Sequence, residues 1–197
     1  MDARTRLIAS AQDLLWERGY SACSPKAIQD RAGAGQGSMY HHFNGKGDLA
    51  RTALERTAHE QRAGAEALFG AGGSPLQRLV SYLRRERDVL RGCPVGRHTQ
   101  DAEVLADPLL RAPVAESFAW LRTRVAQVVA EAQERGELRA APDADAVAAA
   151  IVATVQGGYV LARAAGDEQP FRDATEGAVQ MITALAVPGE EFEEEAR

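Results

Sequence analysis

Residues 33–50, "GAGQGSMYHHFNGKGDLA", combine two adjacent histidines, five glycines and a lysine in a short stretch. Imidazoles could ligate a metal ion, and a glycine-rich turn could hold a phosphate group. Short polar side chains beside a lysine could instead enter the major groove of DNA. These three kinds of site need different neighbours, so the surrounding sequence discriminates between them.

The metal and phosphate interpretations lack the neighbours that they need. Adjacent residues of a helix point about 100° apart, so His41 and His42 do not converge on one ion as residues four apart do. A phosphate loop follows a strand and ends in Gly-Lys-Ser or Gly-Lys-Thr, and neither is present around this segment. We therefore expect no metal site and no cofactor. A solvated turn and helix with Tyr40 and Phe43 in the core is the purely structural alternative.

Helical patterns on both sides of the segment indicate how it is positioned. Apolar residues recur at three-four spacing from Leu7, and Gly19 is a suitable residue to end that helix. In "SACSPKAIQDRAG", Ser24 can cap a second, short helix that has Pro25 as its first residue. After a glycine turn, "QGSMYHHF" can form a third helix, and a long fourth helix follows. Two short helices joined by a tight turn form a helix-turn-helix pattern.

The remaining sequence is also helical in pattern, so the predicted fold class is all-α. "SPLQRLVSYLRRERDVLR" has helical apolar spacing that includes Leu90, and an apolar stripe runs from Leu110 to Ala132. Two last helices, at about 143–165 and 170–186, are rich in short side chains. Such helices approach one another closely, and we expect them to pair with a second copy as a four-helix interface.

Charge and cysteine content limit the classes of function. The net charge is −5, but residues 1–50 hold six Lys or Arg against five Asp or Glu, so the N-terminal segment is weakly basic. This distribution is compatible with DNA binding by the N-terminal segment. Cys23 and Cys93 lie far apart and do not suggest a disulfide framework. With no apolar leader and no uncharged run long enough for a bilayer, we expect a cytoplasmic protein without membrane contacts.

The DNA interpretation assigns a role to more residues of the segment than the alternatives do. Gln36 and Ser38 suit hydrogen bonds to base edges, and Gly37 lets the backbone approach the groove. Tyr40 and His41 can reach phosphate oxygens or a thymine methyl group. Lysines at positions 26 and 46 flank the segment and can pair with phosphates.

The segment with its two preceding residues, "RAGAGQGSMYHHFNGKGDLA", resembles the signature of the TetR family of bacterial regulators, roughly A-G-V-S-x-G-S-x-Y-x-H-F-x-x-K-x-x-L. The resemblance covers residues 3–55 in detail and the rest of the chain in helical layout. Two positions depart from the pattern, because Gly35 replaces a frequent Ser or Thr at the N-cap and Gly47 replaces a frequent acidic residue. The matching positions are Ala32, Gly33, Gly37, Ser38, Tyr40, His42, Phe43, Lys46 and Leu49.

The resemblance implies a three-helix DNA-binding domain, a long fourth helix and a larger helical domain that dimerises and binds a small effector. The implied domains are residues 1–47 for DNA binding and 48–187 for effector binding and dimerisation. The helix breaker and the charge run of the final residues predict a disordered acidic tail at 188–197. Phe43 matches a core position. The positions that match DNA contacts of the family are Lys26, Gln36, Gly37, Ser38, Tyr40, His41, His42 and Lys46.

The effector domain is less readable from sequence than the DNA-binding segment. Its "GCPVG" stretch resembles a segment found in one branch of the family. Cys93 and His98 are a nearby thiol and imidazole, but nothing indicates an oxyanion hole or an orienting acid, so we predict that the protein is not an enzyme. Candidate effector contacts are Tyr82, His98, Phe118, Trp120, Gln156 and Tyr159.

Taken together, these observations predict a ligand-responsive transcriptional regulator. We expect a repressor that binds a palindromic operator as a homodimer and is released by a small molecule. The alternative is a helical protein-interaction module whose helix-turn-helix binds no specific DNA sequence.

Overall fold

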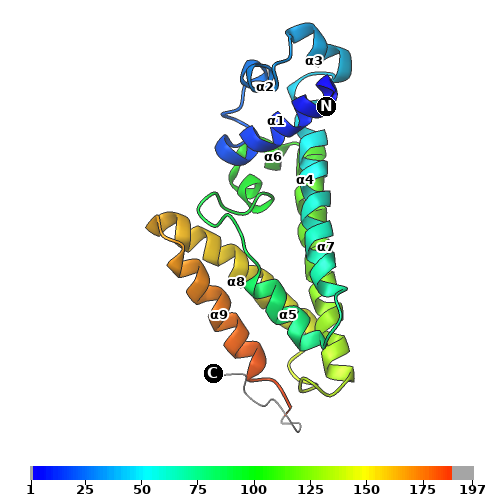
Figure 1. The fold of residues 1–197 in the computed structure, drawn as a ribbon, viewed down its shortest axis with the longest axis vertical. Helices are drawn as coiled ribbons and strands as arrows, with labels where there is room; N and C mark the ends of the chain where they lie inside the picture. The colour runs from blue at the N-terminus through cyan, green and yellow to red at the C-terminus, as the bar shows by residue number, and fades with distance from the viewer. Residues whose placement is uncertain (1, 188–197) are drawn as a thin grey trace. The chain divides into compact units, whose positions relative to one another are not determined.

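The computed structural model describes residues 2–187, and its regular elements there are helices, which confirms the predicted all-α fold (Figure 1). An isolated bridge joins Leu138 and Ala186. The tail predicted at residues 188–197 lies outside the described residues. The elements are α1 Ala3–Arg18, α2 Pro25–Ala32, α3 Gln36–His42, α4 Lys46–Phe69, α5 Pro75–Arg84, the 3-10 helix η1 Gly96–Gln100, α6 Ala102–Ala106, α7 Pro108–Glu134, α8 Ala144–Ala165 and α9 Gln169–Thr183.

The chain divides into two compact units. The first combines Met1–Gly64 with Asp88–Trp120, and the second combines Ala65–Arg87 with Leu121–Arg197. Helices α4 and α7 each contribute to both units. The compact units are defined by how residues pack, whereas the predicted domains are defined by what they bind. The predicted domain boundary between residues 47 and 48 therefore stays a prediction.

Local signals explain where the first helices begin and end. Ser24 accepts a hydrogen bond from the Ala27 N–H at 3.1 Å and caps α2, whose first residue is Pro25. Gly19 ends α1 at φ 82° and Gly33 ends α2 in the left-handed region, where glycine is favoured. Helix α3 has Gly35 at its N-cap and no side-chain capping bond, as the departure from the family pattern implies.

The core of the first unit packs α1, α2 and α3 around the beginning of α4 (Figure 1). Met39 of α3 and Phe43, which directly follows α3, enter this core with 0% and 3% exposure. Val104 of α6 and Leu110 of α7 belong to the same cluster. The segment from residue 88 to residue 120 is therefore packed together with the helix-turn-helix.

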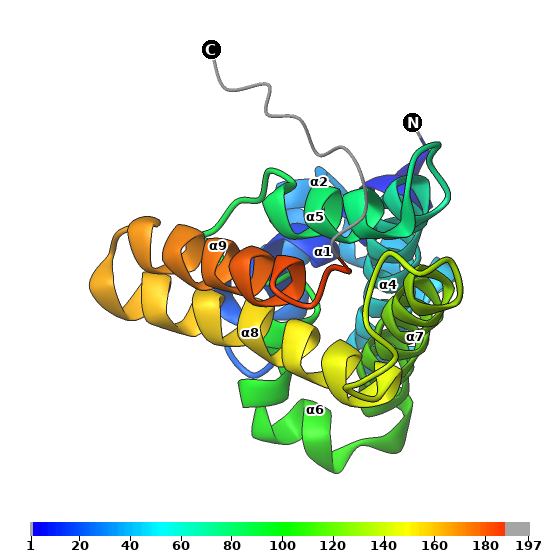
Figure 2. The same ribbon diagram turned by 90° about the horizontal axis from the view of Figure 1, so that it is seen from below.

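The second unit is built on the helical pair α8 and α9, which run side by side, with α5 against α9 (Figure 2). Short side chains permit the close approach of α8 and α9. A Cβ atom added at Gly158 would lie 3.0 Å from Cδ2 of Phe171. The rings of Tyr159 and Phe171 pack with centroids 4.7 Å apart.

The helix predicted to continue towards Leu90 ends earlier, at Arg84, which corrects the sequence-based expectation. The Arg87 guanidinium donates hydrogen bonds to the carbonyl oxygens of Tyr82, Leu83 and Arg85, at 2.6, 2.9 and 2.8 Å. These bonds satisfy carbonyl groups at the end of α5 that another helical turn would have used. Leu90 fits the apolar spacing of the predicted helix, but 44% of its surface is exposed, so it is not a core residue.

Candidate nucleic-acid interface

Helix α3 has an exposed face, while its residue Met39 is buried. Gln36, Gly37, Tyr40 and His41 are exposed, and Tyr40 has 55% of its surface accessible. Positions 36, 37, 40 and 41 share one helical face because residues three and four apart are neighbours on a helix. An exposed tyrosine beside an amide and an imidazole forms a hydrogen-bonding surface with an apolar component.

A buried residue of α3 and the residue at its C-cap hold this face in place. Met39 and Phe43 lie in the core of the first unit. The Gln29 side-chain amide donates to the Met39 sulfur at 3.3 Å and links α2 to α3. Helix α3 is seven residues long, so its orientation depends on these contacts more than on its own helical propensity.

Ser38 and His42 are half-buried, unlike the four exposed residues. The His42 ring contacts the rings of His41 and Phe43 edge to face, with centroids 4.9 and 6.4 Å apart. Among residues 2–187, no group of three His, Cys, Asp or Glu side chains is placed to hold a metal ion. Ser38 and His42, two of the predicted DNA contacts, therefore lie at the border of the exposed face of α3.

The two lysines differ in what surrounds them. The Lys26 side chain is 82% exposed, and its ammonium group lies 3.1 Å from Asp30 on the same helix. The Lys46 ammonium lies 3.9 Å from the centroid of the Tyr20 ring, a cation–π contact. Lys26 can exchange its exposed ion pair for a phosphate at little cost, because such surface pairs contribute about 1 kcal/mol or less.

The turn between α3 and α4 is held by Asp48. Its carboxylate accepts a hydrogen bond from the Asn44 N–H at 3.0 Å and pairs with Arg51 at 3.1 Å. The Asn44 N–H, followed by the Arg51 guanidinium, holds the pKa of the Asp48 carboxyl below its ordinary value. An acidic side chain is thus present at the start of α4 although position 47 is glycine.

Sequence reasoning did not single out Arg4. This arginine is exposed on α1, and its guanidinium carbon lies 5.4 Å from the centroid of the Phe43 ring, beside the end of α3. It adds a cation next to the α3 face. In the sequence, Arg4 is one of several charged residues on the polar side of an amphipathic helix. This pattern does not indicate where Arg4 lies relative to α3.

The predicted effector contacts divide between the two compact units. Tyr82, Gln156 and Tyr159 belong to the second unit, and Tyr82 and Tyr159 are buried with 2% and 7% exposure. Phe69 packs on Tyr82 with ring centroids 4.8 Å apart. These tyrosines therefore contribute to the packing of the second unit. The other three predicted contacts belong to the first unit and are His98, Phe118 and Trp120.

His98 is unsuited to act as a general base for Cys93. Burial, together with the charge of Arg97, lowers the pKa of His98 from 6.5 to about 4 and outweighs the opposing effect of Asp101. The Cys93 sulfur accepts a hydrogen bond from the Gly96 N–H at 3.2 Å, as in a local turn. The thiol and imidazole serve the packing of this loop.

Comparison with known families covers most of the chain. The family model described as "Bacterial regulatory proteins, tetR family" matches residues 7–53, which contain α2, α3 and most of α1. The model described as "Tetracyclin repressor-like, C-terminal domain" matches residues 75–178, more than half of the chain.

Individual relatives agree with these matches. "Transcriptional regulator AcuR" of Cereibacter sphaeroides is 32% identical over 168 residues, which cover 82% of this chain and 76% of the relative. "HTH-type transcriptional repressor DhaR" of Mycobacterium sp. is 25% identical over 171 residues, covering 85% of this chain and 86% of the relative. The structure of regulatory protein TetR from Rhodobacter sphaeroides superposes with a TM-score of 0.80 at 30% identity, covering 90% of this chain and 97% of that one.

The exposed face of α3, the helix-turn-helix that presents it and the matches over both parts of the sequence agree. The protein belongs to the TetR family of transcriptional regulators, which are DNA-binding proteins and not enzymes.

Proposed function

We propose that the protein is a repressor that binds a palindromic operator as a homodimer and releases it when a small molecule binds. The observation that carries this proposal is the exposed face of α3, with Gln36, Gly37, Tyr40 and His41 directed away from the core. The relative DhaR is itself named a transcriptional repressor, which supports the sign of regulation. A cytoplasmic site of action belongs to the same proposal and is supported by the free state of both cysteines.

The proposed DNA contacts divide into two roles. Gln36 and Ser38 read base edges in the major groove, and Gly37 allows the backbone to come close to them. The remaining contacts position the protein on the sugar-phosphate backbone without reading sequence. This second group comprises Lys26, Tyr40, His41, His42 and Lys46.

The proposed homodimer uses the outer surface of α8 and α9. Val160, Leu161 and Met181 are 63%, 56% and 63% exposed, which is unusual for large apolar side chains of a helical pair. Between the two helices, an apolar groove is lined by Ile151 of α8 and Met181 and Ile182 of α9, among others. A second copy on this surface would form a four-helix interface, and the resulting dimer would supply one α3 helix for each of two operator half-sites.

The composition of α8 supports the same interface. By length and composition alone α8 could cross a membrane, and the core helix of a water-soluble protein meets the same criterion. Its most apolar stretch is 33% buried. Pairing with α8 and α9 of a second copy would cover this apolar surface, so we propose dimerisation and not membrane insertion.

The proposed effector acts by a population shift. A ligand that binds more tightly to the state in which the two α3 helices do not match the operator lowers DNA affinity by its preference for that state. We retain Tyr82, His98, Phe118, Trp120, Gln156 and Tyr159 as proposed effector contacts.

Selection from a genomic fragment library tests the function. The purified protein is mixed with the library at low and at physiological salt, and the retained DNA is sequenced. One inverted repeat that survives at physiological salt supports an operator-binding dimer. If only salt-sensitive binding without a common motif is found, the protein-interaction alternative is preferred. Tyr40→Ala should weaken binding of the protein to the repeat while leaving the sedimentation coefficient unchanged.

Replacement of an exposed apolar residue by a charge tests the interface. Met181→Glu should convert the dimer to monomer in analytical ultracentrifugation, because an unpaired carboxylate in an apolar interface is costly to bury. Leu105→Glu is the matched control. Leu105 is also an exposed large apolar residue, with 42% of its surface accessible, but it lies on α6. A dimer that persists in Met181→Glu, or one lost equally in both variants, would contradict the assignment.

A further inference from the structure

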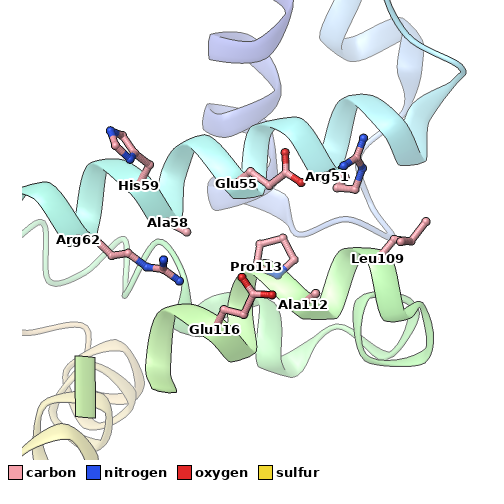
Figure 3. Close-up of a pocket in the computed structure, with 9 residues that line it drawn as sticks. All are labelled: Arg51, Glu55, Ala58, His59, Arg62, Leu109, Ala112, Pro113 and Glu116. Atoms are coloured by element: carbon pink, nitrogen blue, oxygen red, sulfur yellow. Dashed lines mark hydrogen bonds and ion pairs between the residues drawn. The ribbon is translucent and has the colours of Figure 1, made fainter. Parts of the chain in front are cut away.

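A groove of about 320 Å³ lies between residues 51–62 of α4 and residues 109–116 of α7, within the first compact unit (Figure 3). This volume is at the lower end of the range typical of small-molecule sites, roughly 300–1,000 Å³. The residues predicted as effector contacts do not line it. The proposed function assigns no role to the lining of this groove, although the proposed effector contact Trp120 lies against its Arg62.

The charged groups of the groove fall into a paired set and an unpaired set. Arg51 is neutralised by Asp48 at 3.1 Å and by Glu55 at 3.0 Å. Arg62 and Glu116 form no ion pair within residues 2–187, although both line the groove. Figure 3 shows that their side chains extend from opposite helices into the space between α4 and α7. Among the described residues, the groove therefore presents a half-buried cation, Arg62, and a solvent-exposed anion, Glu116, that form no ion pair.

Arg62 is the more constrained of these two groups. Its Nε atom is shielded from solvent and has no hydrogen-bond partner within the described residues. Its guanidinium carbon lies 5.9 Å from the centroid of the Trp120 ring, which limits the orientation of the side chain. A held guanidinium loses less conformational entropy on binding a carboxylate than a freely moving one does.

The remainder of the lining is largely apolar. Ala58 of α4 and Ala112 and Pro113 of α7 contribute small or rigid side chains. Leu109 is 66% exposed at the start of α7 and lines the same groove. An apolar ligand group placed here would remove the exposed leucine surface from water.

We propose that this groove binds a small zwitterion with an apolar side chain, of the α-amino acid class. The carboxylate of the ligand pairs with Arg62, its ammonium group pairs with Glu116, and its side chain packs on Pro113 and Leu109. A ligand with a carboxylate alone would be attracted by Arg62 but repelled by Glu116. A ligand with an amine alone would be attracted by Glu116 but repelled by Arg62. A zwitterion satisfies both unpaired charges.

Three probes with the same branched apolar group test the charge requirement on the full-length protein. Leucine carries both charges, 4-methylpentanoate carries the carboxylate alone and 3-methylbutylamine carries the amine alone. Isothermal titration calorimetry should show saturable binding of leucine. Each singly charged probe should bind at least about tenfold more weakly, since it loses one charge-assisted contact. Equal binding of the three probes would overturn the proposal. So would the absence of binding by leucine, valine, methionine and phenylalanine at millimolar concentration.

Substitutions locate the binding within the groove. Arg62→Gln and Glu116→Gln should each weaken leucine binding by about tenfold, and Glu116→Gln should in addition bring the affinities for leucine and 4-methylpentanoate closer together. Arg56→Gln is the matched control, because Arg56 is on the same helix, is 42% exposed and pairs with Glu60 outside the groove. Thermal unfolding of each variant verifies the fold. Leucine binding that is unchanged in Arg62→Gln, or reduced equally in Arg56→Gln, places the ligand elsewhere and refutes the site.

Discussion

Ser21 donates its backbone N–H and its hydroxyl group to the two carboxylate oxygens of Asp101, at 2.9 and 2.8 Å. Ser21 lies in the turn between α1 and α2, and Asp101 is the N-cap of α6, where it also accepts a bond from the Glu103 N–H at 3.2 Å. Nearby, the Trp16 indole N–H donates to the Gly92 carbonyl at 3.0 Å. The helix-turn-helix is therefore tied directly to the segment that leads into α6.

Ser21→Ala is expected to lower the free energy of unfolding by about 1 kcal/mol, because it removes one side-chain hydrogen bond to a charged acceptor. Burial opposes ionisation of Asp101, but hydrogen bonds led by those from Ser21 hold its pKa below the ordinary value. The stabilisation from Asp101 is thus complete above an unfolded-state pKa of about 4 and is lost as the pH falls through the folded value. Urea unfolding at a series of pH values measures both effects, and Asp101→Asn should flatten this acid-side dependence.

Gln36→Ala should weaken operator binding by about 1 to 3 kcal/mol at particular base pairs, because the amide reads base edges from the exposed face of α3. Binding of the variant to a set of operators, each changed at one position, measures the effect. The variant should discriminate less than the original protein at one position of each half-site. A uniform loss across all operators would assign Gln36 to the phosphates instead.

Lys26→Ala should reduce the slope of log affinity against log salt by about 0.9 for each protomer on the DNA, since one phosphate contact is lost. Affinities at several salt concentrations measure this slope. Lys26 is a clearer test than Lys46, whose replacement would also remove the contact with the Tyr20 ring. Arg172→Gln on α9 removes an exposed cation that pairs with Glu168 and should leave the slope unchanged.

His98 should make the protein less stable at mildly acidic pH. It is 2% exposed, and its pKa is lowered from 6.5 to about 4. Between these two pH values the imidazole is therefore protonated in the unfolded chain and neutral in the folded chain. The free energy of unfolding should consequently fall by on the order of 3 kcal/mol as the pH drops from about 6.5 to 4. His98→Asn should remove this slope in urea titrations, whereas His59→Asn, at an exposed position of α4, should retain it.

Adjacent glycines of α8 should respond differently to alanine. A Cβ at Gly158 would meet Phe171 at 3.0 Å, whereas a Cβ at Gly157 would have no atom within 4 Å. Gly157→Ala should stabilise the protein by up to about 1 kcal/mol through helix propensity. Gly158→Ala should lose that gain to crowding and be less stable than Gly157→Ala by about 1 kcal/mol or more. Denaturant unfolding compares the stabilities of the two variants. Equal stabilities would show that α9 can move away from the added Cβ atom without a loss of stability.

The helix-turn-helix could be predicted from the sequence because its signals are local. Ser24 and Pro25 begin α2 and Gly33 ends it through interactions with residues a few positions away. The pattern of exposed residues around the buried Met39 within α3, from Gln36 to His42, follows from helical periodicity. The family signature lies within this part of the chain for the same reason.

Other features depend on residues that are distant in sequence. Asp101 meets Ser21, Arg4 lies beside Phe43, and Arg62 faces the same groove as Glu116, although no periodicity relates the members of these pairs. The early end of α5 likewise depends on where the side chain of Arg87 folds back. The sequence by itself determined the helices of the helix-turn-helix and the exposed face of α3, since both follow from short-range hydrogen bonding and periodicity. Only the tertiary structure decided which side chains share a surface, because packing within each compact unit brings together elements that local interactions leave independent.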